Sequence, residues 1–395
     1  MAARPLTHLP MPIRRIISPI RELSERGQLA GVLLLLATVA SLLLSNSAGG
    51  AGYRGLWEQH VGYGVLDKSV AHWINDGLMA VFFFMVGLEI RREVLYGELA
   101  EPRQALLPAV AAVGGALVPA GIFLLFTRGS GATHGWAIPT ATDIAFSLGI
   151  LSLLGDRVPP ALRVFLTALA IIDDLLAVLI IAAFYTGGLH LSFLLGAAAI
   201  FALLLTMNRL GVRPLWPYLL LGLGLWFCVL ESGIHATIAG VLLALTVPAT
   251  RLESIEHALD RPVNYLVLPL FALCNTAIVV SAGVLPQLTS GLGLGVILGL
   301  LVGKPVGIVG ATALLVRLGA GQLPTGVNWR RFIGLGCTAG IGFTMAIFIA
   351  TLAFQDAALV DVAKLAVLLG SAAAAVAGAL ILAPGRLTEA GEAEE

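Results

Sequence analysis

Residues 162–181 read LRVFLTALAIIDDLLAVLII, which places Asp173 and Asp174 side by side in an apolar segment long enough to cross a bilayer. A single carboxylate at the bilayer centre costs about 2.5–3.5 kcal/mol on insertion scales, and two adjacent carboxylates also repel each other. The packing of a membrane helix does not require charged side chains at these positions. The pair therefore predicts an ion or proton pathway through a membrane.

The composition of the whole chain agrees with a membrane protein. The 395 residues are 58% hydrophobic and only 12% charged, whereas about 25% of the residues of an ordinary soluble domain are charged. Since each crossing needs about 20 apolar residues, the apolar segments predict an all-α polytopic membrane protein of about twelve transmembrane helices. We expect these helices near residues 27–47, 73–92, 104–127, 135–154, 161–186, 191–208, 215–231, 233–249, 263–283, 290–315, 332–354 and 361–383.

The basic residues are distributed unevenly over the loops of this arrangement. Of the 23 lysines and arginines, only Arg54, Lys68 and Arg128 fall in loops on the side opposite the N-terminus, and Lys304 and Lys364 fall within apolar segments. An excess of basic loop residues marks the cytoplasmic side. We therefore predict that both termini are cytoplasmic. Residues 1–26 then form an N-terminal tail, residues 27–383 the membrane domain, and residues 384–395 an acidic C-terminal tail.

Lys304 is the second charged residue in an unexpected place, within the apolar segment GVILGLLVGKPVG of residues 295–307. An aspartate partner such as Asp173 or Asp174 would make both charges tolerable inside the membrane. The alternative is an inert buried ion pair. The glycines of this segment recur every fourth residue, which favours close approach of another helix, and the aspartate helix is the natural candidate.

Two segments predict helices that break inside the membrane. Residues 137–146 read AIPTATDIAF and residues 334–343 read GLGCTAGIGF, so a proline interrupts one and glycines interrupt the other. The two segments would occupy matching places in two inverted three-helix repeats, helices 3–5 and 10–12, with helices 4 and 11 discontinuous. Asp143 could compensate the facing N-terminal helix ends, and Lys304 the C-terminal ends. The alternative is a pair of ordinary kinks.

Further motifs occur in a fixed order along the chain: NDGLMAVFF at residues 75–83, GLE at 87–89, PTATDIAF at 139–146, IDD at 172–174, SGIHAT at 232–237, GKP at 303–305 and GIGFTM at 340–345. In these motifs the chain resembles the NhaA-type bacterial sodium/proton antiporters. The resemblance implies a bundle with a core at about residues 104–186 and 290–383 and a flanking panel at about residues 27–92 and 233–283. It also implies a multi-pass protein of the bacterial cytoplasmic (inner) membrane.

The same resemblance implies a function. The protein would expel Na+ or Li+ in exchange for H+, with two protons entering per sodium ion, and would serve pH homeostasis. Asp174 would be the principal carboxylate for both ions, Asp173 would pair with Lys304, and Asp143 and Thr142 would line the helix crossing. The residues in regions that the family associates with pH regulation are Glu89, Glu93, His235, Glu256 and His257.

The residues themselves leave the regulatory roles open. Glu89 and Glu93 lie one helical turn apart beside two arginines, so an ion-pair cluster also explains them. His235 could equally be a hydrogen-bonded histidine at a helix end. The loop of residues 251–260, RLESIEHALD, is less basic than we would expect of a family member with steep alkaline activation.

The exchange chemistry needs only a carboxylate with nearby oxygen atoms. A deprotonated carboxylate binds a small hard cation, and protonation removes the charge that holds it, so Na+ and H+ compete for one site. A passive cation channel or a proton-coupled carrier of another solute would also use such a site. An intramembrane aspartyl protease is a more remote alternative, because the chain has no Gly-x-Gly-Asp motif and Lys304 would hold a carboxylate ionised.

The remaining features predict few partners beyond the transported ions and the lipid bilayer. Cys228, Cys274 and Cys337 lie far apart in apolar segments without metal-ligand spacing, so we expect three buried side chains and no resident metal. We also expect no cofactor and no nucleic acid as a partner. The loop of residues 48–70 has Tyr53, Trp57, Tyr63 and Val65 at odd positions, an alternation that permits a small β-hairpin. By resemblance this loop could contribute to a homodimer.

Overall fold

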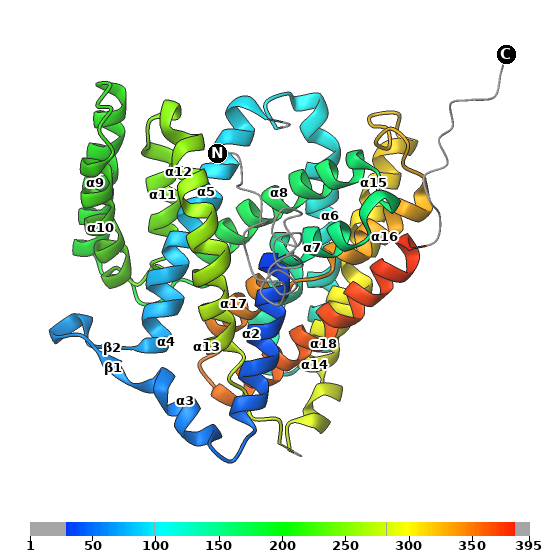
Figure 1. The fold of residues 1–395 in the computed structure, drawn as a ribbon, viewed down its shortest axis with the longest axis horizontal. Helices are drawn as coiled ribbons and strands as arrows, with labels where there is room; N and C mark the ends of the chain where they lie inside the picture. Colours follow the sequence, from blue (N-terminus) through cyan, green and yellow to red (C-terminus); the bar gives the residue numbers. More distant parts are fainter. Residues whose placement is uncertain (1–28, 98, 282, 384–395) are drawn as a thin grey trace, which may run out of the picture.

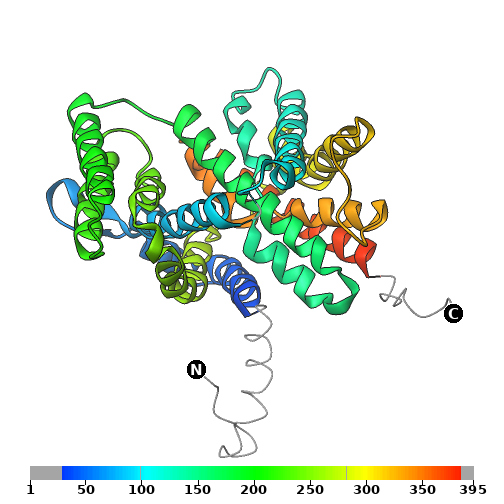
Figure 2. The ribbon, with the colours of Figure 1, turned by 90° about the horizontal axis from the view of Figure 1, so that it is seen from above.

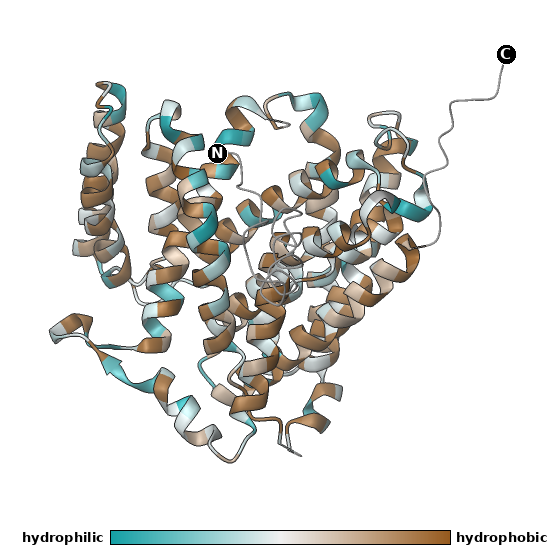
Figure 3. Ribbon diagram, in the orientation of Figure 1, coloured by the Kyte–Doolittle hydropathy of each residue, from teal (hydrophilic) through white to brown (hydrophobic). Residues whose placement is uncertain are grey.

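The computed structural model describes residues 29–97, 99–281 and 283–383, and these residues are mostly helical (Figure 1). Seven helices are long and apolar enough to cross a membrane, and the number rises to ten if each sharply bent helix pair is one crossing. Figure 3 shows that hydrophobic residues cover the middle of the long helices. The fold is therefore that of a polytopic helical membrane protein. The predicted tails at residues 1–26 and 384–395 lie outside the described residues.

The helices begin and end close to most of the predicted boundaries. They are α2 Leu29–Ser45, α3 Gly50–Glu58, α4 Val70–His72, α5 Met79–Tyr96, α6 Pro102–Phe126, α7 Ile144–Leu153, α8 Pro160–Phe184, α9 Leu191–Arg209, α10 Trp216–Glu231, α11 Ile238–Thr246, α12 Leu252–Pro262, α13 Leu268–Asn275, α14 Gly291–Leu298, α15 Lys304–Arg317, α16 Trp329–Ala339, α17 Phe343–Ala353 and α18 Ala357–Leu382. Wider π-helical turns join three of the pairs: η3 Trp73–Leu78, η7 Val263–Val267 and η9 Gly299–Gly303. The 3-10 helix η4 Thr133–Thr140 precedes α7.

Two predicted helices have other bounds in the structure. The helix expected at residues 233–249 begins only at Ile238, because Gly233 adopts a positive φ of 88° that an α-helix does not allow. The helix expected at residues 263–283 ends at Asn275, and an irregular segment follows it. It begins earlier than expected, since α12, η7 and α13 are continuous from Leu252, so most of the expected loop of residues 251–260 is helical. The late start and the early end leave non-helical backbone at the ends of crossings, where it meets solvent or other loops.

The loop of residues 48–70 contains a helix as well as the expected hairpin. Strands β1 His60–Val61 and β2 Lys68–Ser69 are antiparallel, with His60 opposite Ser69. Tyr53 and Trp57 lie on α3 instead, one turn apart, with their rings edge to face at 5.6 Å. The alternation of aromatic residues therefore predicted too long a strand, since a spacing of four residues also places two rings on one helical face.

The helices form two groups on either side of α5 (Figures 1 and 2). On one side α9 packs on α10, and α11 packs on α5 and α10. On the other side α6 packs on α8, α14 and α15, while α16 and α14 pack on α18. Helix α2 packs on α13 and α7. Both broken helices lie within the second group.

The glycine stripe of α14–α15 contacts α6, and not the aspartate helix α8 as we expected. A Cβ atom on Gly307 would lie 2.1 Å from the carbonyl oxygen of Gly114, and one on Gly303 would lie 2.8 Å from Cα of Pro119. Helix α6 has small residues at the same level, so its backbone can approach more closely than that of α8. Lys304 nevertheless reaches an aspartate of α8, because its long side chain extends beyond the helix contact.

This contact predicts opposite effects for two glycine-to-alanine substitutions on α15. Gly307→Ala should destabilise the protein by about 1–3 kcal/mol, because the added methyl group overlaps the backbone of α6. Gly310→Ala is the matched control, since a Cβ there meets nothing within 4 Å and alanine favours the helix. Thermal unfolding in detergent should give a lower Tm only for Gly307→Ala. Equal Tm values for the two variants would contradict the close contact.

Candidate ion site at the helix crossing

The site begins with two breaks that lie against each other. Helix η4 ends at Thr140 and α7 begins at Ile144, while α16 ends at Ala339 and α17 begins at Phe343 with its axis turned by 43°. The backbone N–H of Asp143 in the first break donates to the carbonyl oxygen of Ile341 in the second, at 2.7 Å. Four helix ends therefore meet inside the bundle, each with unsatisfied backbone groups.

Asp143 lies at both N-terminal ends. Its Oδ1 accepts a hydrogen bond from the backbone N–H of Phe146 in α7 at 2.9 Å. Its Oδ2 accepts hydrogen bonds from the backbone N–H and the hydroxyl of Thr344 in α17 at 3.0 and 2.5 Å. A negative charge is favourable at helix N-termini, where the partial charge is positive. Both carboxylate oxygens of Asp143 therefore accept hydrogen bonds from helix N-termini.

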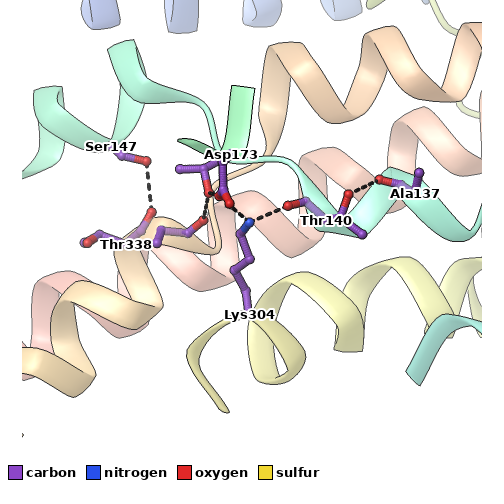
Figure 4. A network of polar contacts seen from close by, with 8 residues as sticks. Ala137, Thr140, Ser147, Asp173, Lys304 and Thr338 are labelled. Atoms are coloured by element: carbon purple, nitrogen blue, oxygen red, sulfur yellow. Dashed lines mark hydrogen bonds and ion pairs between the residues drawn. The ribbon is translucent and has the colours of Figure 1, made fainter. Parts of the chain in front are cut away.

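Lys304 lies at the C-terminal end of η4, beside Thr140 (Figure 4), and Thr142 lies at the C-terminal end of α16. The Lys304 ammonium donates to the carbonyl oxygen of Thr140 at the end of η4, and it forms an ion pair with Oδ2 of Asp173 at 2.5 Å. The Thr142 hydroxyl lies 2.7 Å from the same Asp173 oxygen and 2.8 Å from the carbonyl oxygen of Ala339 at the end of α16. The Ser147 hydroxyl donates to the carbonyl oxygen of Thr338 at 2.9 Å.

Among the described residues, Asp174 combines an unpaired carboxylate oxygen, which Asp173 also has, with a place on a cavity wall, which Asp143 also has. The side chain of Asp174 is 2% exposed, and no hydrogen-bond partner for its Oδ1 occurs within residues 29–97, 99–281 and 283–383. Asp174 also lines a cavity of about 440 Å³, together with Asp143 and Thr344. A carboxylate oxygen that is buried, unpaired and next to a cavity is suited to bind a proton or a small cation.

The cavity connects the crossing with one end of the molecule. Besides the crossing residues, its wall includes Glu89 of α5 and Glu256, His257 and Asp260 of α12. Arg92 donates to Glu256 at 2.9 Å beside this mouth. The cavity therefore has an acidic mouth and an acidic inner end, which would attract cations.

Comparisons with known proteins identify the family. The profile of the family described as Na+/H+ antiporter 1 matches residues 21–382. The chain is similar to proteins named Na(+)/H(+) antiporter NhaA from Rhodospirillum rubrum, at 50% identity with 97% of this chain and 100% of the relative covered, and from Mesorhizobium japonicum, at 48% identity with 97% and 98% covered. A third relative of this name, from Oleidesulfovibrio alaskensis, is 47% identical with 94% and 95% covered. The chain belongs to the Na+/H+ antiporter 1 family.

In this antiporter family member, only some of the site residues predicted from sequence lie at the crossing or the cavity. Asp143, Asp173, Asp174, Thr142 and Lys304 meet at the crossing. Among the residues expected to regulate pH response, Glu89, Glu256 and His257 line the cavity. Glu93 does not line it and contacts Arg92 at 2.8 Å.

His235 lies away from the cavity, in the connection between α10 and α11. The groups that face it are Asp76, His72 and the backbone of Tyr185. Burial lowers the pKa of His235 below its usual value of about 6.5, although Asp76 partly opposes this shift. The structure thus separates His235 from the other candidate regulatory residues of this antiporter family member.

The sequence analysis did not assign three residues that the structure places at the site. Thr344 binds Asp143 with both its backbone N–H and its hydroxyl, and Asp260 and Asn264 line the cavity. Thr344 lies within the GIGFTM motif, so its position directly after a glycine break was a usable signal. Asp260 and Asn264 carried no such signal, because only the folding of α12 toward α5 brings them to the cavity.

The Lys304–Asp173 pair predicts a double-mutant cycle. Lys304→Met should destabilise the protein by about 3–5 kcal/mol, because it leaves a buried carboxylate without its cation. The double variant Lys304→Met/Asp173→Asn removes both charges and should recover a large part of this loss. Thermal unfolding of the wild type, Lys304→Met, Asp173→Asn and the double variant in detergent measures the coupling. A double variant no more stable than Lys304→Met would contradict a direct interaction.

The lowered pKa of His235 predicts a pH-dependent stability. The folded state binds a proton at His235 less readily than the unfolded state, so stability falls as the pH falls below about 6.5. His235→Gln should make Tm fall less as the pH drops below about 6.5. At higher pH the substitution should not give the same gain in stability. An unchanged slope in the variant would mean that His235 makes no contribution.

Proposed function

We propose that this chain expels Na+ from the cell in exchange for H+, and that both ions compete for the carboxylate of Asp174. Membership of the Na+/H+ antiporter 1 family supports the exchange reaction. One observation carries the assignment of the site: among the crossing aspartates, Asp174 alone both has an oxygen without a partner in the described residues and lines the cavity. Oδ1 of Asp173 is also unpaired there, but Asp173 is not part of the cavity wall.

The other two aspartates are less suited to this role. Both oxygens of Asp143 accept hydrogen bonds from the starts of α7 and α17, so a proton or cation there would weaken the crossing. Oδ2 of Asp173 is held by Lys304 and Thr142. The unpaired Oδ1 of Asp173 can contribute a second ligand, and the Thr142 hydroxyl a third.

Exchange follows from competition at this site. With Asp174 deprotonated, a Na+ ion entering the cavity gains two carboxylates and a hydroxyl, and it displaces Lys304 from Asp173. Protonation removes the charges that hold the ion. If only the sodium-loaded or protonated site can change its access between the two sides, each sodium leaving is matched by protons entering. Two protons per sodium ion would make the exchange electrogenic.

The orientation in the membrane is part of the same proposal. The cavity mouth lies near Arg92, which pairs with Glu256 of its wall, on the side where most arginines fall in the predicted loops, so it opens toward the cytoplasm of a bacterial inner membrane. Both termini are then cytoplasmic. Twelve crossings with two inverted repeats would account for matching breaks before α7 and α17. Glu89, Glu256 and His257 at the mouth would set the pH response, and the β1–β2 hairpin would form a homodimer contact.

The exchange reaction is tested in everted membrane vesicles with an acidic interior and a pH-sensitive dye. Addition of Na+ or Li+ should raise the interior pH, and Asp174→Asn should abolish this response while the protein remains folded, because an amide has no negative charge to hold the cation and does not exchange a proton in this pH range. Asp260→Asn is the matched control, since Asp260 also lines the cavity but is exposed at its mouth.

The outcomes discriminate between the candidate functions. Wild-type exchange in Asp174→Asn would contradict the assignment of the site. Cation flux that does not respond to a pH gradient would instead indicate a passive channel. A proton flux that requires a different solute would indicate another proton-coupled carrier.

A further inference from the structure

Lys364 is a second lysine within a membrane-spanning segment, and the exchange mechanism does not use it. Its ammonium lies on α18, is partly buried and donates to Oδ1 of Asn275 on α13 at 3.3 Å. The amide of Asn275 in turn donates to Oδ1 of Asn75 on η3 at 2.7 Å. Three helices that lie far apart in the sequence therefore share one polar cluster, which we call the Lys364 cluster.

The Lys364 cluster lies across the crossing from the cavity. On α18 the hydroxyl of Ser371 accepts from the backbone N–H of Phe343 at the start of α17, at 3.1 Å. Lys364 precedes Ser371 by seven residues, which places it on the same helical face and about 10 Å further along the axis. Asn75 likewise precedes Glu89, at the cavity mouth, by about 20 Å of helix.

The helices around the Lys364 cluster extend from the crossing in the direction opposite to the cavity mouth. Helix α17 begins at the crossing, and α13 packs on both α17 and η3. In Figure 1, α13 and α3 lie toward the lower end of the molecule and α12 toward the upper end. These contacts place the Lys364 cluster among η3, α13, α17 and α18, on the side of the crossing away from the cavity mouth.

The charged groups near the Lys364 cluster differ from those at the cavity mouth. No carboxylate oxygen lies within 4.0 Å of the Lys364 ammonium among the described residues, whereas Lys304 has a direct carboxylate partner. The charged groups in electrostatic range are Asp361, one turn earlier on α18, and Arg54 of α3, which interacts with Asp361. The cavity mouth, by contrast, has Glu89, Glu256 and Asp260.

We propose that ions move between Asp174 and the outer side past the Lys364 cluster, between η3, α13, α17 and α18, and that the charge of Lys364 lowers the apparent affinity for Na+ on this side. A fixed positive charge repels cations from a narrow low-dielectric route and so reduces rebinding of a released ion. The negative charge of Asp361 raises the apparent affinity for Na+ on the outer side. The direction of net transport still depends only on the gradients, and the charge changes the sodium concentration at which the outer side saturates. This inference rests on the proposed function.

The test compares the two faces of the membrane at low ionic strength. The KM for Na+ is measured in everted vesicles, where the cytoplasmic side faces the medium, and in right-side-out vesicles, where the outer side does. Lys364→Gln should lower the outer KM roughly three- to tenfold and leave the inner KM unchanged. Asp361→Asn should raise the outer KM, and Lys364→Arg should keep the wild-type value.

A structural role for Lys364 would give a different pattern. It would lower the maximal rate or shift the KM on both sides alike, and it would not give opposite signs for Lys364→Gln and Asp361→Asn. High ionic strength should shrink both shifts, because salt screens accessible charges. An unchanged outer KM, or equal shifts on both faces, would overturn the inference.

The controls separate this inference from the proposed function. Wild-type vesicles without sodium-dependent proton movement would refute the exchange function itself, whereas exchange without a side-specific shift refutes only the role of Lys364. If Lys364→Gln does not fold, Asp361→Asn carries the test alone. A raised outer KM would then support the inference, and an unchanged one would refute it.

Discussion

The fold depends on side chains that compensate the partial charges of the four helix ends where the two interrupted helices cross. Breaking a helix inside the bundle leaves backbone N–H and C=O groups without partners, and a low-dielectric interior makes this costly. Asp143 satisfies the two N-terminal ends, while Lys304 and Thr142 satisfy carbonyl oxygens at the two C-terminal ends. These contacts hold the crossing together, and the glycine contacts between α15 and α6 hold Lys304 at the correct depth.

This compensation also separates the roles of the three aspartates. The carboxylates that stabilise helix ends or the lysine cannot exchange ions freely without loosening the crossing. Asp174 makes no comparable contact through Oδ1 in the described part of the chain, so its charge state can change while the helix ends remain capped. The proposed exchange site is thus the one crossing carboxylate that the fold does not require for its own stability.

Sequence reasoning anticipated the charged elements of this site because each is costly inside a membrane. Asp143, Asp173, Asp174 and Lys304 stood out in apolar segments, and the proline and glycines beside them predicted the two breaks. Sequence reasoning failed where one local pattern was compatible with more than one structure. The aromatic residues of α3 matched a strand alternation, and the glycine stripe of α15 did not specify its partner helix.

The sequence by itself therefore determined a helical membrane protein with charged residues and helix breaks near its centre, because hydropathy and the cost of burial act locally along the chain. Only the tertiary structure decided which helices meet. It placed Asp174 beside a cavity, brought Asp260 of α12 to the mouth, and joined Lys364 to Asn275. The physical reason is that hydropathy fixes which segments enter the membrane, while the close fit of side chains between helices fixes their neighbours.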